Sequence, residues 1–371
     1  MKKIGITTFH NAHNYGAMLQ AFALCNILSK ENDVEIINYY NSKIYDTYKI
    51  IRPFNKDLVA STKTLILDLI YIKNKRKRYK SFNDFINNKC KLSEKFFNVE
   101  DIEKNALFYD ILVTGSDQVW SKEIVGELSD VYTLNFGNKD LRRISYAASV
   151  GSSQTIIDNK EEYFNKIRKL DCISVREEDV KEQLDKIMDK QIDVVLDPTL
   201  LLTKQDWNSE IDKIDNQNQK YIFAYVVKPD EEYIKIVNDL SEKTGLKVIH
   251  FGLKNPGYKN VLKSAYTEGP LEFVNYIKNA EYVVATSFHA TVFSIIFNKK
   301  FFIVPHRKTG ARVTNLLDKL GITGRTFSTL EEFKKIDYNF ETDWKKVEEK
   351  LDIEREKSIN WLKNAIEGEM N

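Results

Sequence analysis

Short apolar runs and amphipathic stretches alternate from the beginning of the chain. Residues 3–9 form a short run rich in β-forming side chains, and a polar loop at 10–16 follows it. Apolar side chains then recur at helical spacing over residues 17–29, and residues 34–39 form a second apolar run. This pattern predicts a strand, a helix and a second strand, which is the repeating unit of a parallel α/β sheet.

The alternation resumes beyond residue 105 and continues to the C-terminus. It predicts strands at 110–114, 143–150, 171–175, 192–196, 221–227, 247–251, 281–285 and 301–304. It predicts helices at 159–170, 177–189, 230–243, 270–279, 289–297, 311–320 and about 342–367. Two successive series of this kind predict an α/β protein with two doubly wound, Rossmann-like domains, at residues 1–205 and 206–371, and a C-terminal helix in the second.

Residues 42–105 interrupt this rhythm and predict a helical insertion in the first domain. The stretch at 73–80, with Lys73 and Lys80 at its ends, holds six basic side chains in eight positions. The pattern favours a solvated helix face. The alternative is a surface that meets anionic lipid head groups or a phosphate-bearing substrate.

Composition places the chain among globular proteins. Of its 371 residues, 42% are hydrophobic and 30% are charged, which excludes collagen-like, disordered and disulfide-scaffold classes. The 56 basic and 54 acidic residues give a net charge of +2, so a nucleic-acid partner is not indicated. The three cysteines, Cys25, Cys90 and Cys172, are widely spaced, which favours buried thiols in a reducing compartment.

The apolar runs are shorter than the roughly 20 residues that a membrane-spanning helix needs. The start of the chain resembles a secretion signal, but polar residues at 10–14 end the apolar stretch too early for one. We therefore expect a cytoplasmic protein. Peripheral contact with the inner membrane face, through residues 73–80, is the further possibility that the basic stretch raises.

Ligands of doubly wound sheets bind beyond the carboxyl ends of the strands, so the loops there are candidate sites. The first polar loop of this kind opens a helix, where N–H groups attract anions, and contains Asn14, Tyr15 and Gly16. A plain helix N-cap by Asn14 is the alternative. The second loop offers groups that suit sugar hydroxyls, or a simple turn, and contains Gly115, Ser116, Asp117 and Gln118.

Two further loops carry cationic or titratable groups. Arg176 follows a predicted strand and suits a carboxylate or phosphate, although a salt bridge to Glu177 or Glu178 explains it equally well. His289 follows Ser287 where a strand meets a helix, which makes it a candidate proton donor rather than an ordinary core histidine. Lys308 and Arg312 lie beyond the next strand and add positive charge, so we expect an anionic ligand.

Six stretches, in order along the chain, resemble the polysaccharide pyruvyl transferase family. They are Asn14-Tyr15-Gly16-Ala17 with Leu19-Gln20-Ala21, Gly115-Ser116-Asp117-Gln118-Val119-Trp120, Ser145-Tyr146-Ala147-Ala148-Ser149, Ser174-Val175-Arg176-Glu177, Leu196-Asp197-Pro198-Thr199 and Ser287-Phe288-His289-Ala290-Thr291-Val292-Phe293-Ser294. The resemblance covers residues from about 3 to 325. Each stretch is unspecific alone, and it is their shared order that indicates the family.

The resemblance implies a fold like that of the two-domain GT-B glycosyltransferases. It implies transfer of pyruvate from phosphoenolpyruvate onto two hydroxyls of one sugar, forming a cyclic ketal in the synthesis of a capsule or exopolysaccharide. It also implies that Arg176 and His289 contact phosphoenolpyruvate. Two departures stand out: many family members have Arg where this chain has Ser287-Phe288, and Gly where it has Ala290. Lys308 or Arg312 would then replace the missing anion contact.

We therefore expect His289 to act as general acid and Asp117 as the hydroxyl-side base or sugar anchor. The donor is expected to be held by Arg176, Ser287, Lys308 and Arg312. We expect no metal and no cofactor beyond the donor substrate, and an acceptor sugar carried by a lipid or a nucleotide. Two alternatives remain: a GT-B glycosyltransferase that uses a nucleotide sugar, and a non-catalytic sugar-binding protein.

Overall fold

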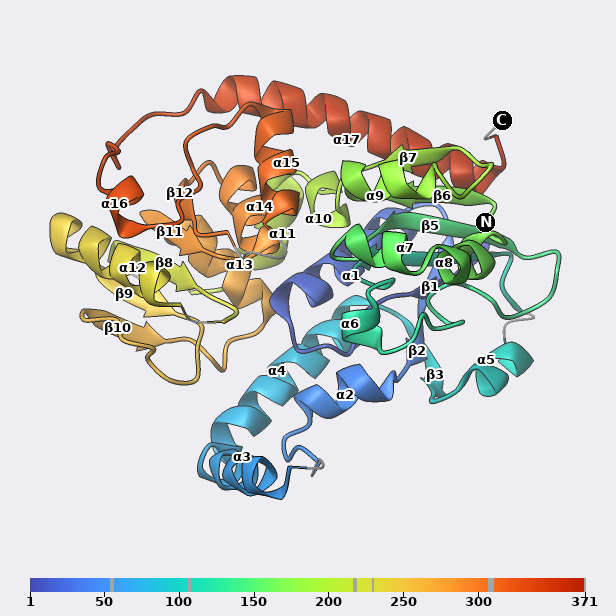
Figure 1. The fold of residues 1–371 in the computed structure, drawn as a ribbon, viewed down its shortest axis with the longest axis horizontal. Coiled ribbons are helices and arrows are strands. Elements are labelled where there is room, and N and C mark those ends of the chain that lie inside the picture. The colour runs from blue at the N-terminus through green and yellow to red at the C-terminus, as the bar shows by residue number, and fades with distance from the viewer. Residues whose placement is uncertain (54–56, 106–107, 216–218, 229, 306–309, 370–371) are drawn as a thin grey trace. The chain divides into compact units, whose positions relative to one another are not determined.

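The computed structural model describes residues 1–371 except 54–56, 106–107, 216–218, 229, 306–309 and 370–371. The chain divides into two compact units (Figure 1). The first consists of Met1–Leu201 and Ile353–Asn371, and the second of Leu202–Asp352. The division between Leu201 and Leu202 lies near the predicted boundary at 205.

The first unit is built on a parallel sheet of seven strands in the order β3-β2-β1-β4-β5-β6-β7. The strands are β1 (Lys3–Thr7), β2 (Asp33–Tyr39), β3 (Leu92–Phe96), β4 (Ile111–Asp117), β5 (Arg142–Ala148), β6 (Cys172–Val175) and β7 (Ile192–Val194). Its helices are α1 (Tyr15–Leu28), α2 (Ser42–Tyr48), α3 (Leu58–Ile70), α4 (Ile72–Lys89), α5 (Val99–Asn105), α6 (Lys122–Val125), α7 (Gln154–Asp158), α8 (Lys160–Ile167), α9 (Glu178–Leu184) and α10 (Pro198–Leu201). The strand order reverses direction between β1 and β4, so a crevice is expected beyond the carboxyl ends of these two strands.

The second unit contains a parallel sheet of five strands in the order β10-β9-β8-β11-β12. The strands are β8 (Tyr221–Tyr225), β9 (Lys247–His250), β10 (Val261–Ser264), β11 (Tyr282–Ala285) and β12 (Lys300–Ile303). Its helices are α11 (Lys204–Ile211), α12 (Glu231–Thr244), α13 (Pro270–Asn279), α14 (Phe288–Ile296), α15 (Ala311–Leu320), α16 (Leu330–Phe333) and the beginning of α17 (Trp344–Glu367). Here the order reverses between β8 and β11.

The C-terminal part of α17 packs on the first unit, which differs from the prediction that residues 353–371 belong to the second domain. Arg355 Nε donates to Leu200 O at 2.8 Å, and Ser358 Oγ accepts from Leu196 N at 3.0 Å. Trp361 Nε1 donates to Asp193 Oδ2 at 2.8 Å. These contacts join the C-terminal part of the helix to β7 and to the segment that follows it, and sequence periodicity carries no signal for them.

Candidate functional site

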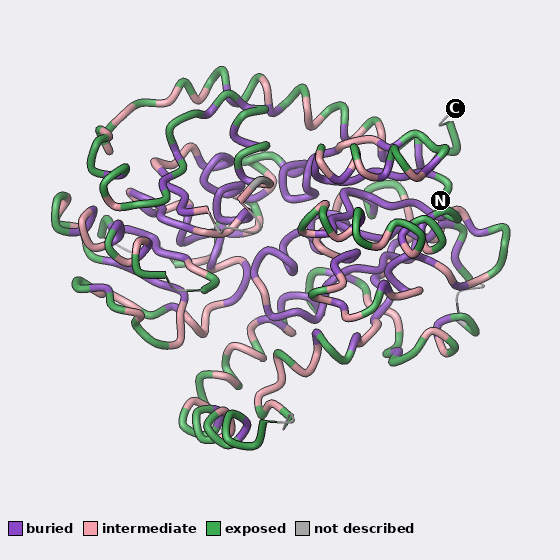
Figure 2. The backbone as a smooth tube through the Cα atoms, viewed as in Figure 1, coloured by how far each residue is buried: buried purple, intermediate pink, exposed green. Residues whose placement is uncertain are grey.

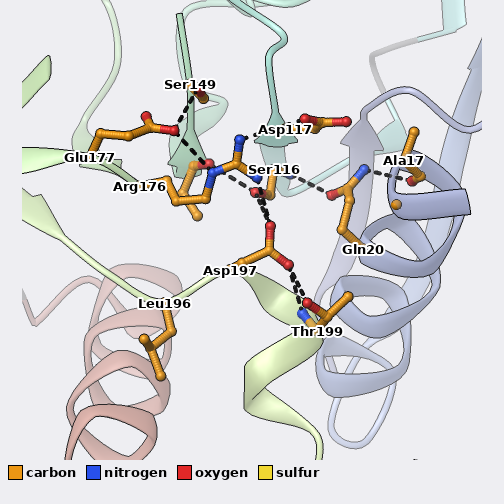
Figure 3. Close-up of polar contacts among 12 residues, drawn as sticks. Ala17, Gln20, Ser116, Asp117, Ser149, Arg176, Glu177, Leu196, Asp197 and Thr199 are labelled. Carbon is orange, nitrogen blue, oxygen red and sulfur yellow. Dashed lines mark hydrogen bonds and ion pairs between the residues drawn. The ribbon is translucent and has the colours of Figure 1, made fainter. Parts of the chain in front are cut away.

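The guanidinium of Arg176 lies at the carboxyl end of β6, surrounded by carboxylates (Figure 3). Its side chain is only 3% exposed. Nη1 donates to Asp197 Oδ2 at 2.8 Å, Nε donates to Glu177 Oε1 at 3.1 Å, and Nη2 lies 3.6 Å from Asp117 Oδ1. The predicted partner Glu177 is therefore one of three.

This cluster carries one positive and three negative charges. Burial by itself lowers the pKa of Arg176, but the charges of Glu177, Asp197 and Asp117 outweigh burial and raise that pKa. The guanidinium therefore stays charged and offsets part of the repulsion among the three carboxylates. The sum of the four charges is 1 − 3 = −2, which makes the immediate surroundings of Arg176 unfavourable for a phosphate.

Hydroxyl donors hold two of the carboxylates in place. Ser149 Oγ donates to Glu177 Oε1 at 2.8 Å. Thr199 donates to Asp197 Oδ1 twice, from its backbone N at 3.0 Å and from Oγ1 at 2.6 Å. Glu177 and Asp197 are thereby fixed within the protein, whereas the Asp117 side chain is 14% exposed. Asp117 is therefore the member of the cluster that a substrate can reach.

The end of β4 brings the backbone unusually close to β5. A Cβ on Gly115, where φ is +115°, would lie 2.2 Å from Tyr146 O, so only glycine fits there. The next residue, Ser116, donates its backbone N–H to Gln20 Oε1 at 3.0 Å. Asp117 itself has a φ of +70°, a left-handed conformation that costs a non-glycine residue energy. This backbone directs the Asp117 carboxylate toward Arg176.

A pocket of about 250 Å³ lies at the crevice between β1 and β4. Its polar lining comes from both strand-end loops and from the helices beside them: Asn14, Lys43, Thr47, Tyr48, Asp117, Gln118 and Glu123. Burial raises the pKa of Tyr48, so its phenol stays protonated and can donate a hydrogen bond. The structure thus brings together three of the predicted site residues, Asn14, Asp117 and Gln118.

The residues of the first loop, including Asn14, also have structural partners. Asn14 Oδ1 accepts from Gly16 N at 3.0 Å and Ala17 N at 3.3 Å, which is the N-cap alternative. Tyr15 is buried, and its hydroxyl accepts a hydrogen bond of 2.5 Å from Arg78 Nη1. The amides of Gly16 and Ala17 are thus already engaged, which weakens the case for an anion at this helix start.

His13 lies next to this pocket, and the pH dependence of protein stability can test its lowered pKa. Burial, and secondarily the charge of Arg78, lower its pKa to about 3. An unfolded chain binds this proton below pH 6.5, whereas the folded chain does so only near pH 3. We therefore expect His13 to contribute a fall in the free energy of unfolding of about 1.4 kcal/mol per pH unit as the pH drops below 6.5.

Urea unfolding of wild type and His13→Gln at several pH values between 7 and 5 checks this expectation. His10, which is also buried with a lowered pKa, contributes equally to both proteins and cancels in the difference. The variant should lose less stability than the wild type on acidification. If the free energy of unfolding fell equally with pH in both proteins, His13 would bind its proton as readily in the folded protein as in the unfolded chain.

In the second unit, His289 is the second residue of α14 and follows the carboxyl end of β11. The strand order reverses beside β11, so His289 occupies the position that doubly wound sheets use for ligands. The residue is 7% exposed, and its ring packs edge-on against Phe288 with centroids 5.3 Å apart. Ser287 is the N-cap of this helix, and its carbonyl oxygen accepts from Thr291 Oγ1 at 3.1 Å.

Of the two other predicted cationic residues of this unit, the structure describes one. Arg312 lies in the first turn of α15 and is half-buried. Lys308 lies outside the described residues.

Residues 14–308 match the family model described as polysaccharide pyruvyl transferase. The chain belongs to this family. No curated protein sequence matches the chain. Among solved structures, a putative UDP-N-acetylglucosamine 2-epimerase from Listeria monocytogenes is similar, with 11% identity and a TM-score of 0.51 over 97% of this chain and 90% of that one. The UDP-GlcNAc 2-epimerase from Methanocaldococcus jannaschii has 15% identity and a TM-score of 0.49 over 93% and 94%. The glycosyltransferase SnogD from Streptomyces nogalater has 10% identity and a TM-score of 0.43 over 99% and 98%.

These comparisons confirm the family and the fold class that the sequence predicts: two doubly wound α/β domains of the GT-B kind with a C-terminal helix. The identities are too low to transfer an activity from these solved structures. Within the described part of the chain, no group of three or more His, Cys, Asp or Glu side chains could hold a metal ion. No helix among the described residues is long and apolar enough to cross a bilayer.

Several residues of the candidate site escaped the sequence prediction. Asp197 stands in a stretch that matches the family, but nothing in the sequence indicates that it reaches Arg176. Lys43, Tyr48 and Glu123 come from short helices whose position beside the pocket depends on the tertiary fold. Gln20 is apparent only as a polar residue within an apolar helix, a signal of a buried hydrogen bond.

Proposed function

We propose that this protein transfers pyruvate from phosphoenolpyruvate onto two hydroxyls of a sugar, forming a ketal during synthesis of a capsule or exopolysaccharide. The family match over residues 14–308 carries the proposal. The donor is proposed as the only cofactor-like molecule required, and the acceptor as a lipid-linked or nucleotide-linked sugar. No nucleic-acid partner is proposed, and the reaction is placed in the cytoplasm, at or near the inner membrane face.

The pocket of the first unit is the proposed acceptor site. A sugar presents hydroxyls that donate and accept hydrogen bonds, and the pocket offers the Asp117 carboxylate, the Gln118 amide and the Tyr48 phenol. Asp117 is proposed to accept the proton of the attacking hydroxyl or to anchor it. Arg176 is proposed to orient Asp117 through the 3.6 Å ion pair.

The donor is proposed to be bound by cationic and polar residues of the second unit, Ser287, His289, Lys308 and Arg312. The contact between Arg176 and phosphoenolpyruvate that the family resemblance implies stays a prediction. The three carboxylates around Arg176 oppose it, because a doubly charged donor would meet a net negative cluster. We therefore assign Arg176 chiefly to positioning.

In the proposed reaction the imidazolium of His289 donates a proton to the methylene carbon of phosphoenolpyruvate, which makes the adjoining carbon electrophilic. A sugar hydroxyl forms a C–O bond with that carbon and gives its proton to Asp117. The bond from the same carbon to the phosphate oxygen then breaks, and the departing phosphate takes the proton from Asp117 and leaves as hydrogen phosphate. The second hydroxyl closes the ring, and its proton returns to the imidazole.

A donor panel with the full chain tests the proposal. We expect inorganic phosphate to be released from phosphoenolpyruvate only when a sugar acceptor is present, and the product to gain the mass of a pyruvate ketal. Asp117→Asn should reduce this turnover by about 10²-fold or more because the proton acceptor is lost. Release of a nucleoside diphosphate from a nucleotide sugar would instead support a glycosyltransferase, and acceptor binding without turnover would support a sugar-binding protein.

A further inference from the structure

Helix α3 presents most of its large apolar side chains outward, whereas the two side chains that it buries are polar. Its large apolar residues are exposed to the following extents: Leu58 67%, Val59 67%, Ile66 53%, Leu67 39%, Leu69 51% and Ile70 64%. The two buried residues of the helix are Ser61 and Asp68. Six of its thirteen residues thus form an outward apolar face, which is the reverse of a surface helix in a globular protein.

Ion pairs on the inward side hold this orientation. The Asp68 side chain has no exposed area, and Oδ2 accepts from Arg52 N at 3.0 Å and from Arg52 Nε at 3.2 Å. Lys75 Nζ of α4 bonds to the same carboxylate. Burial alone would raise the pKa of Asp68, but these hydrogen bonds and the charge of Arg52 lower it to about 2. Rotating α3 to bury its apolar face would therefore expose Asp68 and break its ion pairs with Arg52 and Lys75.

The next helix adds a row of positive charge. Lys73, Arg76, Lys77 and Lys80 of α4 are exposed at the spacing i, i+3, i+4 and i+7, so they share one helix face. Lys80 pairs with Asp84, and the other three form no ion pair with any described residue. The basic stretch is not wholly solvated, because Lys75 and Arg78 face inward onto Asp68 and Tyr15.

Figure 1 shows α3 at the end of α4 that lies farthest from the sheet of the first unit, and in Figure 2 most of α3 carries the green of exposed residues. The apolar face ends at Ile70 and the basic row begins at Lys73, less than one helical turn later along the chain. A patch of six exposed large apolar side chains on one helix marks an interaction surface in soluble proteins. Apolar side chains flanked by Lys and Arg are the combination that binds the interface of an anionic bilayer.

We propose that α3 and the basic row of α4 dock this protein onto an anionic phospholipid surface. The apolar face of α3 enters the boundary between head groups and acyl chains, and Lys73, Arg76, Lys77 and Lys80 contact lipid phosphates. A second copy of the chain fits less well, because a two-fold contact would bring two sets of these basic side chains together. The proposal does not depend on the chemistry assigned to the pocket.

Flotation of the full chain with vesicles tests the proposal. We expect binding to vesicles of equal parts phosphatidylcholine and phosphatidylglycerol, weak binding to phosphatidylcholine alone, and weakening by salt. Ile66→Asp with Ile70→Asp should reduce the partition coefficient at least tenfold, because the charges must enter the apolar boundary. Lys73→Gln with Lys77→Gln should reduce it roughly fivefold for each side chain removed.

Matched controls separate this surface from general effects of charge. Ile157→Asp with Ile353→Asp introduces the same charges at residues 40% and 54% exposed, and Lys345→Gln with Lys346→Gln removes two exposed lysines elsewhere. These controls should float like the wild type. The proposal is overturned if the wild type does not bind anionic vesicles, or if the control variants lose binding as much as the test variants. It is also overturned if sedimentation shows a dimer that the double variant Ile66→Asp with Ile70→Asp dissociates.

Discussion

Replacing Arg176 with methionine is expected to lower the free energy of unfolding of the first unit by about 3–5 kcal/mol. The variant leaves Asp117, Glu177 and Asp197 close together without the guanidinium that they share, and two of them are almost fully buried. Urea unfolding measures the loss of free energy of unfolding. Hydrogen exchange of the β6 amides then shows whether the loss affects the first unit.

Charge compensation and packing can be distinguished by adding Glu177→Gln and Asp197→Asn to the Arg176→Met variant. Removal of two unpaired carboxylates should restore part of the lost stability, whereas a loss of packing would persist. Arg168→Met, at an exposed arginine, should stay within about 0.5 kcal/mol of wild type. If Arg176→Met were as stable as Arg168→Met, the buried cluster would not contribute to folding.

Arg176→Lys provides the test of positioning. Lysine keeps the charge but offers a point donor in place of the planar fork, so it cannot bond Glu177 and Asp197 in the same geometry. We expect the KM for the acceptor sugar to rise or kcat to fall through Asp117, while the KM for phosphoenolpyruvate changes little. A selective rise in the phosphoenolpyruvate KM would instead identify Arg176 as a donor contact.

The sequence predicts the inner strands of both sheets because each is a short apolar run between turns. It misses β3 and β10, which are the outermost strands on one side of their sheets. Their sequences, Leu-Ser-Glu-Lys-Phe and Val-Leu-Lys-Ser, lack a continuous apolar run because one edge faces no further strand. Periodicity therefore predicts the buried part of an α/β sheet better than its margins.

The site was predictable to the extent that strand-end loops are recognisable in sequence. Asn14, Asp117 and Gln118 lie at or beyond the ends of strands on either side of the reversal in strand order, so the rule for doubly wound sheets brings them together. Of the partners of Arg176, the neighbouring Glu177 was predicted, whereas Asp197 was not, because 21 residues separate it from Arg176 along the chain. The outward face of α3 was also missed, because a run of apolar residues carries no information on which side is buried.

Replacing His289 with asparagine is expected to reduce kcat for pyruvyl transfer by about 10²–10⁴-fold. Asparagine has a similar size but cannot donate a proton at neutral pH, so the methylene carbon of the donor would lose its acid. The acceptor KM should stay close to the wild-type value, because the proposed acceptor contacts belong to Asp117 and Gln118. Phosphate release at saturating phosphoenolpyruvate, measured over a range of acceptor concentrations, provides both constants.

Ser294→Ala is the matched control for this experiment, since it lies in the same helix and removes only the hydrogen bond from Ser294 Oγ to Ala290 O. It should retain most of the activity. Circular dichroism and thermal melting must show that His289→Asn is folded, because His289 is largely buried at the start of α14. A folded His289→Asn variant with wild-type kcat would remove histidine from the mechanism and require another acid for the carbon protonation.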